Sequence, residues 1–294
     1  DPARGAYAAN DLLTIALSNR HMRCPLEATG SHARVLTPGD FGLAELSRSE
    51  MTRMRAAVEQ EIEALEGCEP AKEFFEMVRQ RAAFDEATKD KKKGRGAVNL
   101  NCVVTGNPGV GKTTFARLLF KFLRAYGMLP CDAFVEMNGL ELKGKYCGHT
   151  APKVKDAVRS ALGGMLFIDE AYALGGDGPG EKGDVFSREA VRTLLTELEN
   201  HRTQLCVVFA GYRDKMNGFM RCDPGLPRRL PQSFHLPDYT PRQLVKIMRR
   251  VSVDRFDVKI ADELDDARLE EHIASEHGHE ISQHNAALAI NLVE

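Results

Sequence analysis

No charge of either sign is in excess in this sequence of 294 residues. The chain carries 40 lysines and arginines against 42 aspartates and glutamates, a formal net charge of −2. This balance predicts no general attraction to nucleic acid or to an anionic membrane, and it leaves only a local basic surface as an alternative. No apolar run approaches the roughly 18 residues that a membrane-spanning helix requires, so no such helix is expected.

The cysteines form no C-x-x-C pair, and several of them lie within apolar runs. The seven are Cys24, Cys68, Cys102, Cys131, Cys147, Cys206 and Cys222. Scattered cysteines of this kind predict reduced thiols in the cytoplasm, or in another reducing compartment such as a plastid stroma, and no zinc site. The chain begins at Asp1 without a methionine or a signal-peptide pattern, and we expect a fragment or a processed product.

One stretch carries a strong chemical signature. Residues 106–113 read GNPGVGKT and fit G-x-x-x-x-G-K-[ST], the pattern of a loop that wraps the phosphates of a nucleotide. A short apolar, β-branched run at 100–105 precedes the loop, and a helical pattern at 115–123 follows it. That strand and helix context favours a phosphate-binding loop (P-loop) over a Gly/Pro turn that contains Lys-Thr by chance.

The loop predicts ATP and Mg²⁺ as cofactors. Its glycines allow the backbone N–H groups to point inward, and the helix that follows adds its positive N-terminal end. Lys112 is expected to reach the β- and γ-phosphates, and Thr113 to hold Mg²⁺. The predicted nucleotide contacts are Asn107, Pro108, Gly109, Val110, Gly111, Lys112, Thr113 and Thr114.

Two acidic residues follow the apolar run at 165–168. Asp169 would lie at the tip of a parallel strand adjacent to the strand of the P-loop, where its carboxylate can reach the metal held by Thr113. Glu170 is then placed to polarise the attacking water as the catalytic base. The alternatives are a chance Asp-Glu pair and a small-molecule kinase, in which the second acid would have no evident task.

After the loop, short β runs alternate with helices, which predicts an α/β fold with a parallel sheet covered by helices on both faces. The predicted strands are 100–105, 133–137, 165–168 and 205–210, with 234–236 as a candidate closing strand. The predicted helices of this part are 115–123, 150–162 and 186–200. From Thr240 the strands stop, and helices are expected at 241–251, 261–275 and 281–294. We therefore predict a nucleotide-binding α/β domain at 97–238 and a small helical domain at 239–294.

Helical patterns also precede the loop. Those at 41–65 and 71–88 predict N-terminal helices of the same module, spanning 41–96. Residues 1–40 are interpreted as a linker. The run KDKKKGRG that ends at Gly96 favours a solvated loop over a binding patch, and the glycine-rich residues 175–183 favour a mobile loop over one that contacts a partner.

Five segments resemble, in order and spacing, the AAA+ ATPases that include red-type Rubisco activase and the stage V sporulation protein K group. They are 106–114, 146–153, 166–172, 210–212 and 223–226, and the resemblance extends from Leu43 to the C-terminus. It implies that the helical domain is a lid, truncated here, which clasps ATP against the sheet. It also implies a homo- or hetero-hexameric ring in which ATP hydrolysis remodels a protein client, Rubisco in the closest case.

The resemblance also assigns single positions in two places. Lys145, Tyr146 and Cys147 match the central pore loop, where Tyr146 would grip an extended client by stacking and apolar contact. The alternative is a tyrosine packed beneath its own loop. Gly67 and Cys68 match the hinge that usually lines the adenine.

An arginine finger for the ATP of a neighbouring subunit is implied after residue 226. Arg228 and Arg229 match the segment that supplies it, and an arginine there would neutralise charge in the transition state. Pro227 stands where relatives commonly have an arginine, which leaves Arg229 as the stronger catalytic candidate and Arg228 as the reserve. The alternative is a surface arginine pair near a turn.

The last predicted helix departs from the family. Ala287 and Ile290 stand where relatives carry lid arginines, and no arginine follows Arg268. The sequence therefore supports ATP binding more than turnover, and an ATP-binding ring component or scaffold with weak or no turnover is the alternative function. Nucleic-acid handling, as in clamp loaders, is a third hypothesis, which the balanced charge disfavours.

Two further patterns carry hypotheses of their own. Residues 8–13 and 289–294 resemble each other, which suggests that residues 1–23 close a preceding AAA+ unit of a tandem array. Two unrelated amphipathic helices are the alternative. Residues 276–280 read EHGHE and favour a turn between helices over a metal site.

Overall fold

The computed structural model describes residues 48–63, 69–87, 99–129, 131–144, 146, 148–175, 185–202, 204–261 and 264–293. The predictions for residues 1–40, for the charged run up to Gly96 and for the glycine-rich stretch after Gly175 lie outside these residues. So do those for Gly67, Cys68, Lys145 and Cys147. Within the described part, no helix combines the length and the apolar character needed to cross a bilayer.

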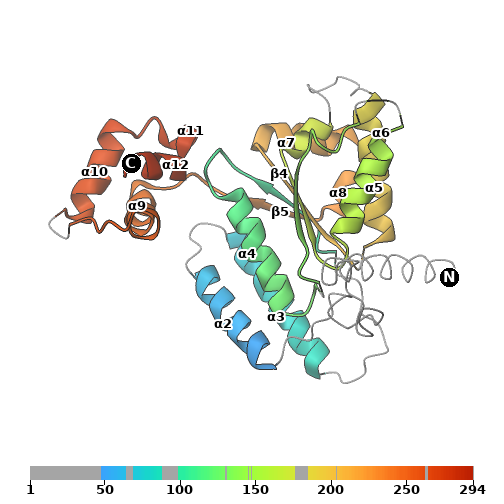
Figure 1. Ribbon diagram of the computed structural model, residues 1–294, viewed down its shortest axis with the longest axis horizontal. Helices are drawn as coiled ribbons and strands as arrows, with labels where there is room; N and C mark the ends of the chain where they lie inside the picture. Colours follow the sequence, from blue (N-terminus) through green and yellow to red (C-terminus); the bar gives the residue numbers. More distant parts are fainter. Residues whose placement is uncertain are drawn as a thin grey trace, which may run out of the picture.

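A five-stranded parallel sheet with the order β2-β3-β4-β1-β5 forms the centre of the molecule (Figure 1). Its strands are β1 (Cys102–Thr105), β2 (Phe134–Asn138), β3 (Met165–Asp169), β4 (Cys206–Gly211) and β5 (Gln232–His235). Every pairing is parallel, so the carboxyl ends of all five strands meet at one edge. The predicted α/β fold is confirmed.

Strand β4 lies between β1 and β3, where Val208 pairs with Cys102 on one side and with Phe167 on the other. The prediction that Asp169 sits on a strand adjacent to that of the P-loop is therefore wrong. Chain order does not fix strand order, because the helical connection between parallel strands can pass over a neighbouring position. The end of β4 consequently lies between the P-loop and the acidic pair.

Helices cover both faces of the sheet, as Figure 1 shows. One face is covered by α2 (Arg48–Glu63), α3 (Glu69–Ala87) and α4 (Lys112–Ala125). The other is covered by α5 (Thr150–Ser160), α6 (Val185–Asn200), α7 (Arg213–Cys222) and α8 (Leu226–Arg229), with a 3-10 turn η3 (Ala171–Leu174) at the sheet edge.

The two faces have separate apolar cores because side chains alternate along each strand. In β1, Val104 packs with the α2–α4 layer and Val103 with the α5–α8 layer. Helix α4 contributes Phe115, Leu119 and Phe122 to the first core, at the spacing of one helical face. The buried face of α4 holds this helix against the sheet, and the helix in turn fixes the position of the P-loop that leads into it.

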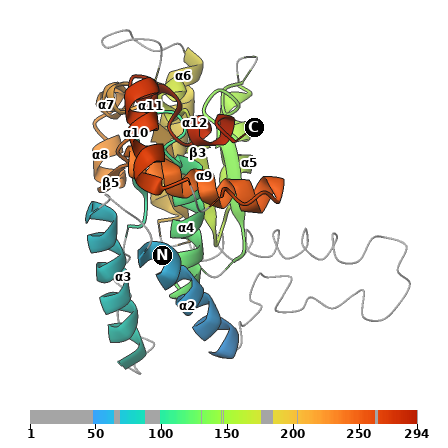
Figure 2. The same ribbon diagram turned by 90° about the vertical axis from the view of Figure 1, so that its left-hand side faces the viewer.

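The C-terminal helices, referred to below as the lid, have an apolar core of their own. They are α9 (Pro241–Phe256), α10 (Asp266–Glu276), α11 (Ile281–His284) and α12 (Ala286–Asn291). Leu244, Met248, Ile273 and Leu288 pack together in it. The lid stands beside the sheet domain in Figure 1 and lies in front of it in Figure 2.

The predicted single helix at 281–294 is wrong, because the chain breaks between α11 and α12. The break is Asn285, which has φ 47° and ψ −121° and is fully buried. That conformation is rare for a residue with a side chain, and it leaves the helical path entirely. The reason for it lies in the contacts that Asn285 makes outside the lid.

Candidate functional site

The P-loop connects the end of β1 to the start of α4. Gly109 and Gly111 have φ values of 72° and 86°, a left-handed region that glycine enters without strain. The N–H of Gly106 donates to Gly211 O at 3.2 Å, which ties the loop to β4. Among the described residues, the amides of 109–113 have no acceptor, so this face of the loop fits an anion at a helix N-terminus.

Lys112 bends back over the loop that precedes it. Its Nζ donates to Gly106 O at 3.0 Å and to Asn107 O at 2.9 Å. Burial lowers the pKa of Lys112, and the charges of Asp169 and Glu170 oppose that shift. An ammonium held by two carbonyls can exchange them for phosphate oxygens, so this geometry fits the predicted nucleotide.

Glu170 is held at both carboxylate oxygens. Asn138 Nδ2 donates to Oε2 at 3.1 Å, and the Tyr172 hydroxyl donates to Oε1 at 3.2 Å. The backbone of Glu170 is left-handed, with φ 49°, a costly conformation that clusters at functional sites. Burial first, and the neighbouring Glu170 second, raise the pKa of Tyr172 to about 12, so its hydroxyl stays protonated at neutral pH.

Asp169 lies one residue before Glu170 at the end of β3. Its Oδ1 accepts the N–H of Glu170 at 2.8 Å, and its charge acts on the pKa of Lys112. Thr113 follows Lys112 in the first turn of α4. Their part in Mg²⁺ binding stays a prediction. Two protein side chains are enough for such a site, because Mg²⁺ usually keeps several waters and phosphate oxygens as its other ligands.

An aromatic pair connects Lys112 to the partner of Glu170. The rings of Tyr172 and Tyr212 stack with centroids 5.8 Å apart, and Lys112 Nζ lies 5.5 Å from the Tyr212 centroid. Nζ of the exposed Lys215 lies 4.6 Å from the Tyr172 centroid. The sequence analysis missed Asn138, Tyr172 and Tyr212. Asn138 ends β2, Tyr212 directly follows β4, and Tyr172 lies two residues after Glu170. These positions beside the strand ends are the signal that could have found them.

The lid approaches the P-loop closely at Gly109. A Cβ on Gly109 would lie 2.3 Å from the carbonyl oxygen of His284, a distance that real Cβ atoms do not show. Gly127 has nearly the same φ, 71°, but a Cβ there would meet nothing within 4 Å. The two glycines therefore separate backbone strain from contact with the lid.

We predict that Gly109→Ala costs about 1–3 kcal/mol more folding free energy than Gly127→Ala, because only the first forces two segments apart. Both variants pay the left-handed cost, so the difference reports the contact alone. Denaturant unfolding of the two variants measures it. Equal costs would show that the backbone at His284 moves away freely.

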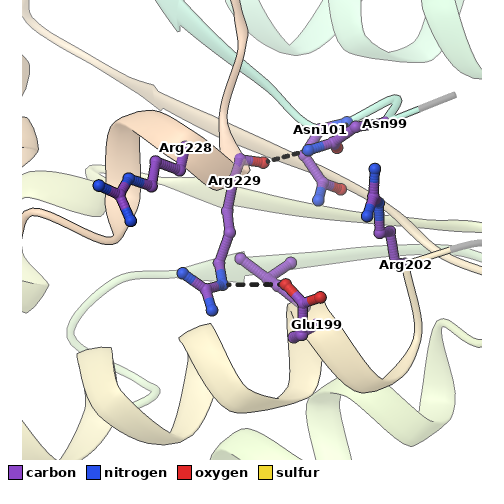
Figure 3. A pocket seen from close by; sticks show the side chains of 7 residues that line it. Asn99, Asn101, Glu199, Arg202, Arg228 and Arg229 are labelled. Atoms are coloured by element: carbon purple, nitrogen blue, oxygen red, sulfur yellow. Dashed lines mark hydrogen bonds and ion pairs between the residues drawn. The ribbon is translucent and has the colours of Figure 1, made fainter.

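Arg229 lies at the amino ends of the strands, whereas the P-loop lies at their carboxyl ends. Arg229 precedes β5 and Asn101 precedes β1, whereas the P-loop follows β1. A surface cavity of about 240 Å³ lies here (Figure 3), lined by Asn99, Asn101, Leu198, Glu199, Arg202, Arg228 and Arg229. The structure therefore does not bring either finger candidate to the P-loop of its own chain.

The two neighbouring arginines differ in their contacts. Arg229 Nε lies 3.5 Å from Glu199 Oε2, and its Nη1 donates to Gly225 O at 3.4 Å. Its carbonyl accepts Asn99 Nδ2 at 3.0 Å. Arg228 is exposed and points away from Glu199 in Figure 3. Arg229 is thus the oriented member of the pair, and Arg228 extends into solvent.

Tyr146 is 69% exposed, and its ring makes a T-shaped contact with the described residue His149, with centroids 5.6 Å apart. It does not pack beneath its own loop. Gly148, two residues on, is left-handed with φ 83°. An exposed tyrosine at a turn fits a client contact, which stays a prediction.

In the described part of the chain, no group of three His, Cys, Asp or Glu could hold a metal ion.

This fold and loop define a domain of the P-loop nucleotide-binding class, and residues 102–238 match the family model of the ATPase family associated with various cellular activities (AAA). The chain belongs to this family. The predicted resemblance to red-type Rubisco activase and stage V sporulation protein K is also confirmed by its relatives.

Three relatives show the extent of the similarity. Protein CfxQ of Xanthobacter flavus is 34% identical over 243 residues, which cover 83% of this chain and 73% of that protein. Stage V sporulation protein K of Bacillus subtilis is 35% identical over 67% of this chain and 60% of its own length. The chloroplastic ribulose bisphosphate carboxylase/oxygenase activase of Cyanidioschyzon merolae is 43% identical over half of each chain.

Proposed function

We propose that this chain is an ATPase module that binds ATP with Mg²⁺ and hydrolyses it to remodel a protein client. The observation that carries the proposal is the convergence of Lys112, Asp169 and Glu170 at one edge of the sheet, where Asp169 and Glu170 act on the pKa of Lys112. An isolated P-loop would bind a nucleotide. A glutamate oriented at both oxygens adds a group that can activate water.

The residues divide the work. Lys112 and the amides of the P-loop would bind the phosphates, and Thr113 with Asp169 would hold Mg²⁺. Bound Mg²⁺ would neutralise charge on the phosphates. Glu170 would orient and deprotonate water, with Asn138 and Tyr172 fixing its carboxylate. Gly67 and Cys68 would contact the adenine. The module would consist of N-terminal helices (41–96), the nucleotide-binding domain (97–238) and the helical lid (239–294).

A ring supplies what a single chain lacks. The finger candidates lie at the sheet edge away from the P-loop, so Arg229 can serve only a neighbouring copy. The exposed Tyr146, with Lys145 and Cys147, would contact the client in the centre of a hexamer. Rubisco is the client that one relative's name suggests. Native mass measurement with ATP tests the assembly, and a protein that stays monomeric would contradict the ring.

We predict that Lys112→Ala weakens ATP binding about 10- to 150-fold. A hydrogen bond to a charged group contributes about 1.5–3 kcal/mol, and Lys112 is the cation that lies over the loop. Titration with ATP and Mg²⁺ measures the affinity, and phosphate release should fall in parallel. Lys155→Ala, on the exposed face of α5, is the matched control. Equal ATP affinity of the two variants would show that the nucleotide does not bind at this loop.

The alternative function is an ATP-binding ring component with weak or no turnover. Ala287 and Ile290 lie on α12, where relatives carry arginines, so the lid offers no guanidinium from these positions. This alternative predicts ATP-dependent assembly with little phosphate release. A nucleic-acid function predicts instead that DNA stimulates the ATPase in a salt-dependent manner.

A further inference from the structure

Five successive carbonyls of the P-loop all have donors, and the donors come from two sides. Lys112 holds the first two, Gly106 O and Asn107 O. The next three are held from the lid side: Pro108 O by Asn285 Nδ2 at 3.0 Å, Gly109 O by the N–H of Ala286 at 3.3 Å, and Val110 O by the Tyr239 hydroxyl at 3.1 Å.

This division has a geometric consequence for the loop. Successive carbonyl and N–H groups of a curled backbone point to opposite sides, so carbonyls fixed toward the lid leave the N–H groups facing the other way. The amides of 109–113 are among those that have no acceptor in the described chain. The lid thus holds the carbonyl edge of the phosphate cradle from outside.

Asn285 is the centre of these contacts. Its Nδ2 also donates to Asp238 Oδ1 at 2.9 Å, and its Oδ1 accepts the N–H of Tyr239 at 2.9 Å. The residue has no exposed surface, and φ 47° with ψ −121° is a conformation that costs about 1–3 kcal/mol. Such strain persists only where surrounding contacts over-determine the backbone, as they do here.

Asp238 connects the side chain of the P-loop residue Asn107 to Asn285. Its two carboxylate oxygens accept Asn107 Nδ2 at 2.9 and 3.0 Å while Oδ1 also accepts Asn285 Nδ2. Asn107 and Asn285 therefore share one carboxylate across the boundary between sheet domain and lid. A change in the loop that moves Asn107 or Pro108 must move or break the bonds of Asn285.

We infer that Asn285 is a positioning residue for the phosphate cradle and couples nucleotide binding to the docking of the lid. It acts through the outer carbonyls of the P-loop, in a chain whose lid has no arginine at Ala287 or Ile290. The inference rests on the proposed ATP binding. Because coupling is reciprocal, a lid that shapes the cradle is itself held more tightly once phosphates bind.

The test is to compare ADP with adenosine as ligands of the whole chain carrying Asn285→Asp or Asn285→Gly. Asn285→Asp removes the amide donor and places a carboxylate against Asp238 and Pro108 O. Asn285→Gly removes all three side-chain bonds, to Pro108 O, to Asp238 Oδ1 and to the N–H of Tyr239, but relieves the backbone strain. We expect both variants to lose at least about 10-fold in ADP affinity, with adenosine affinity unchanged, and the KM for ATP to rise more than kcat falls.

Two further variants keep the test decisive. Asn291→Asp changes charge in the same way on an exposed position of α12, and it should bind ADP like the wild type. Tyr239→Phe removes only the hydroxyl that holds Val110 O, and it should lose ADP affinity several-fold even if the Asn285 variants fold poorly.

Three outcomes would overturn the inference. Equal losses of ADP and adenosine affinity would make Asn285 a stabiliser of the hinge alone. Wild-type ADP affinity in Asn285→Gly or in Tyr239→Phe would show that the outer carbonyls need no donor. Absence of ADP binding by the wild type would overturn the proposed function, and this inference with it.

Discussion

Replacement of Glu170 by glutamine should lower ATP turnover by about 10²–10⁴-fold while ATP stays bound, because a general base contributes this much. Glutamine has nearly the shape of glutamate but cannot accept a proton from water. With its oxygen toward Asn138 Nδ2, its amide can donate to the Tyr172 hydroxyl, so glutamine can keep a contact with both partners of Glu170. Phosphate release and ATP titration on the same sample separate the two effects.

Glu136→Gln is the matched control for this experiment. Glu136 lies on β2, two residues before Asn138, and pairs with Arg117 at the surface. Its loss of charge should change turnover little, because an exposed ion pair contributes at most about 1 kcal/mol. Equal phosphate release by wild type and Glu170→Gln would contradict the enzyme and favour the ATP-binding scaffold.

The features predicted correctly from the sequence are those set by neighbours in the chain. The P-loop, its strand and its helix follow from a local pattern of glycines and apolar residues. Strand β4 consists of buried residues alone, so its apolar run is visible without any partner. Helices α7 and α8 were not predicted. Only Met216 and Phe219 of α7 are buried, and Gly218 interrupts its pattern.

The features that the sequence did not reveal depend on contacts between distant segments. The position of β4 beside β1 is one, since no local pattern records strand order. The break at Asn285 is another. Its flanking residues read as a continuous helix, and the bonds to Pro108 and Asp238 that favour the break come from residues far away in the chain.

The partners of Glu170 have the same origin. Asn138 ends β2 and reaches the carboxylate only because β2 pairs with β3 in a register that sets Asn138 opposite Asp169. Tyr172 is close in sequence, yet its contact depends on the left-handed backbone of Glu170. The proposed catalytic residues were thus accessible from the motif, whereas the residues that contact them required the sheet.

Arg229→Ala should lower turnover of the assembled protein by about 10³–10⁵-fold, the size of effect that an arginine finger supplies. In transition-state terms this is about 4–7 kcal/mol. The pair of Arg229 with Glu199 is partly exposed, with 29% and 49% of the side chains accessible, and such pairs contribute about 0–1 kcal/mol. Release from Glu199 therefore costs little against the gain, and Arg229 can turn toward a neighbouring copy.

Arg228→Ala is the control, because Arg228 is exposed and adjacent but points away from Glu199. Arg228→Ala should change turnover only a few-fold. A larger loss of turnover in Arg228→Ala than in Arg229→Ala would assign the arginine finger to Arg228. Mixing provides the sharper test of action between subunits. An Arg229→Ala subunit keeps Glu170, and a Glu170→Gln subunit keeps Arg229, so an equimolar mixture should regain turnover that neither variant has alone. Failure to recover in a mixture that still assembles would mean that Arg229 does not act across the interface.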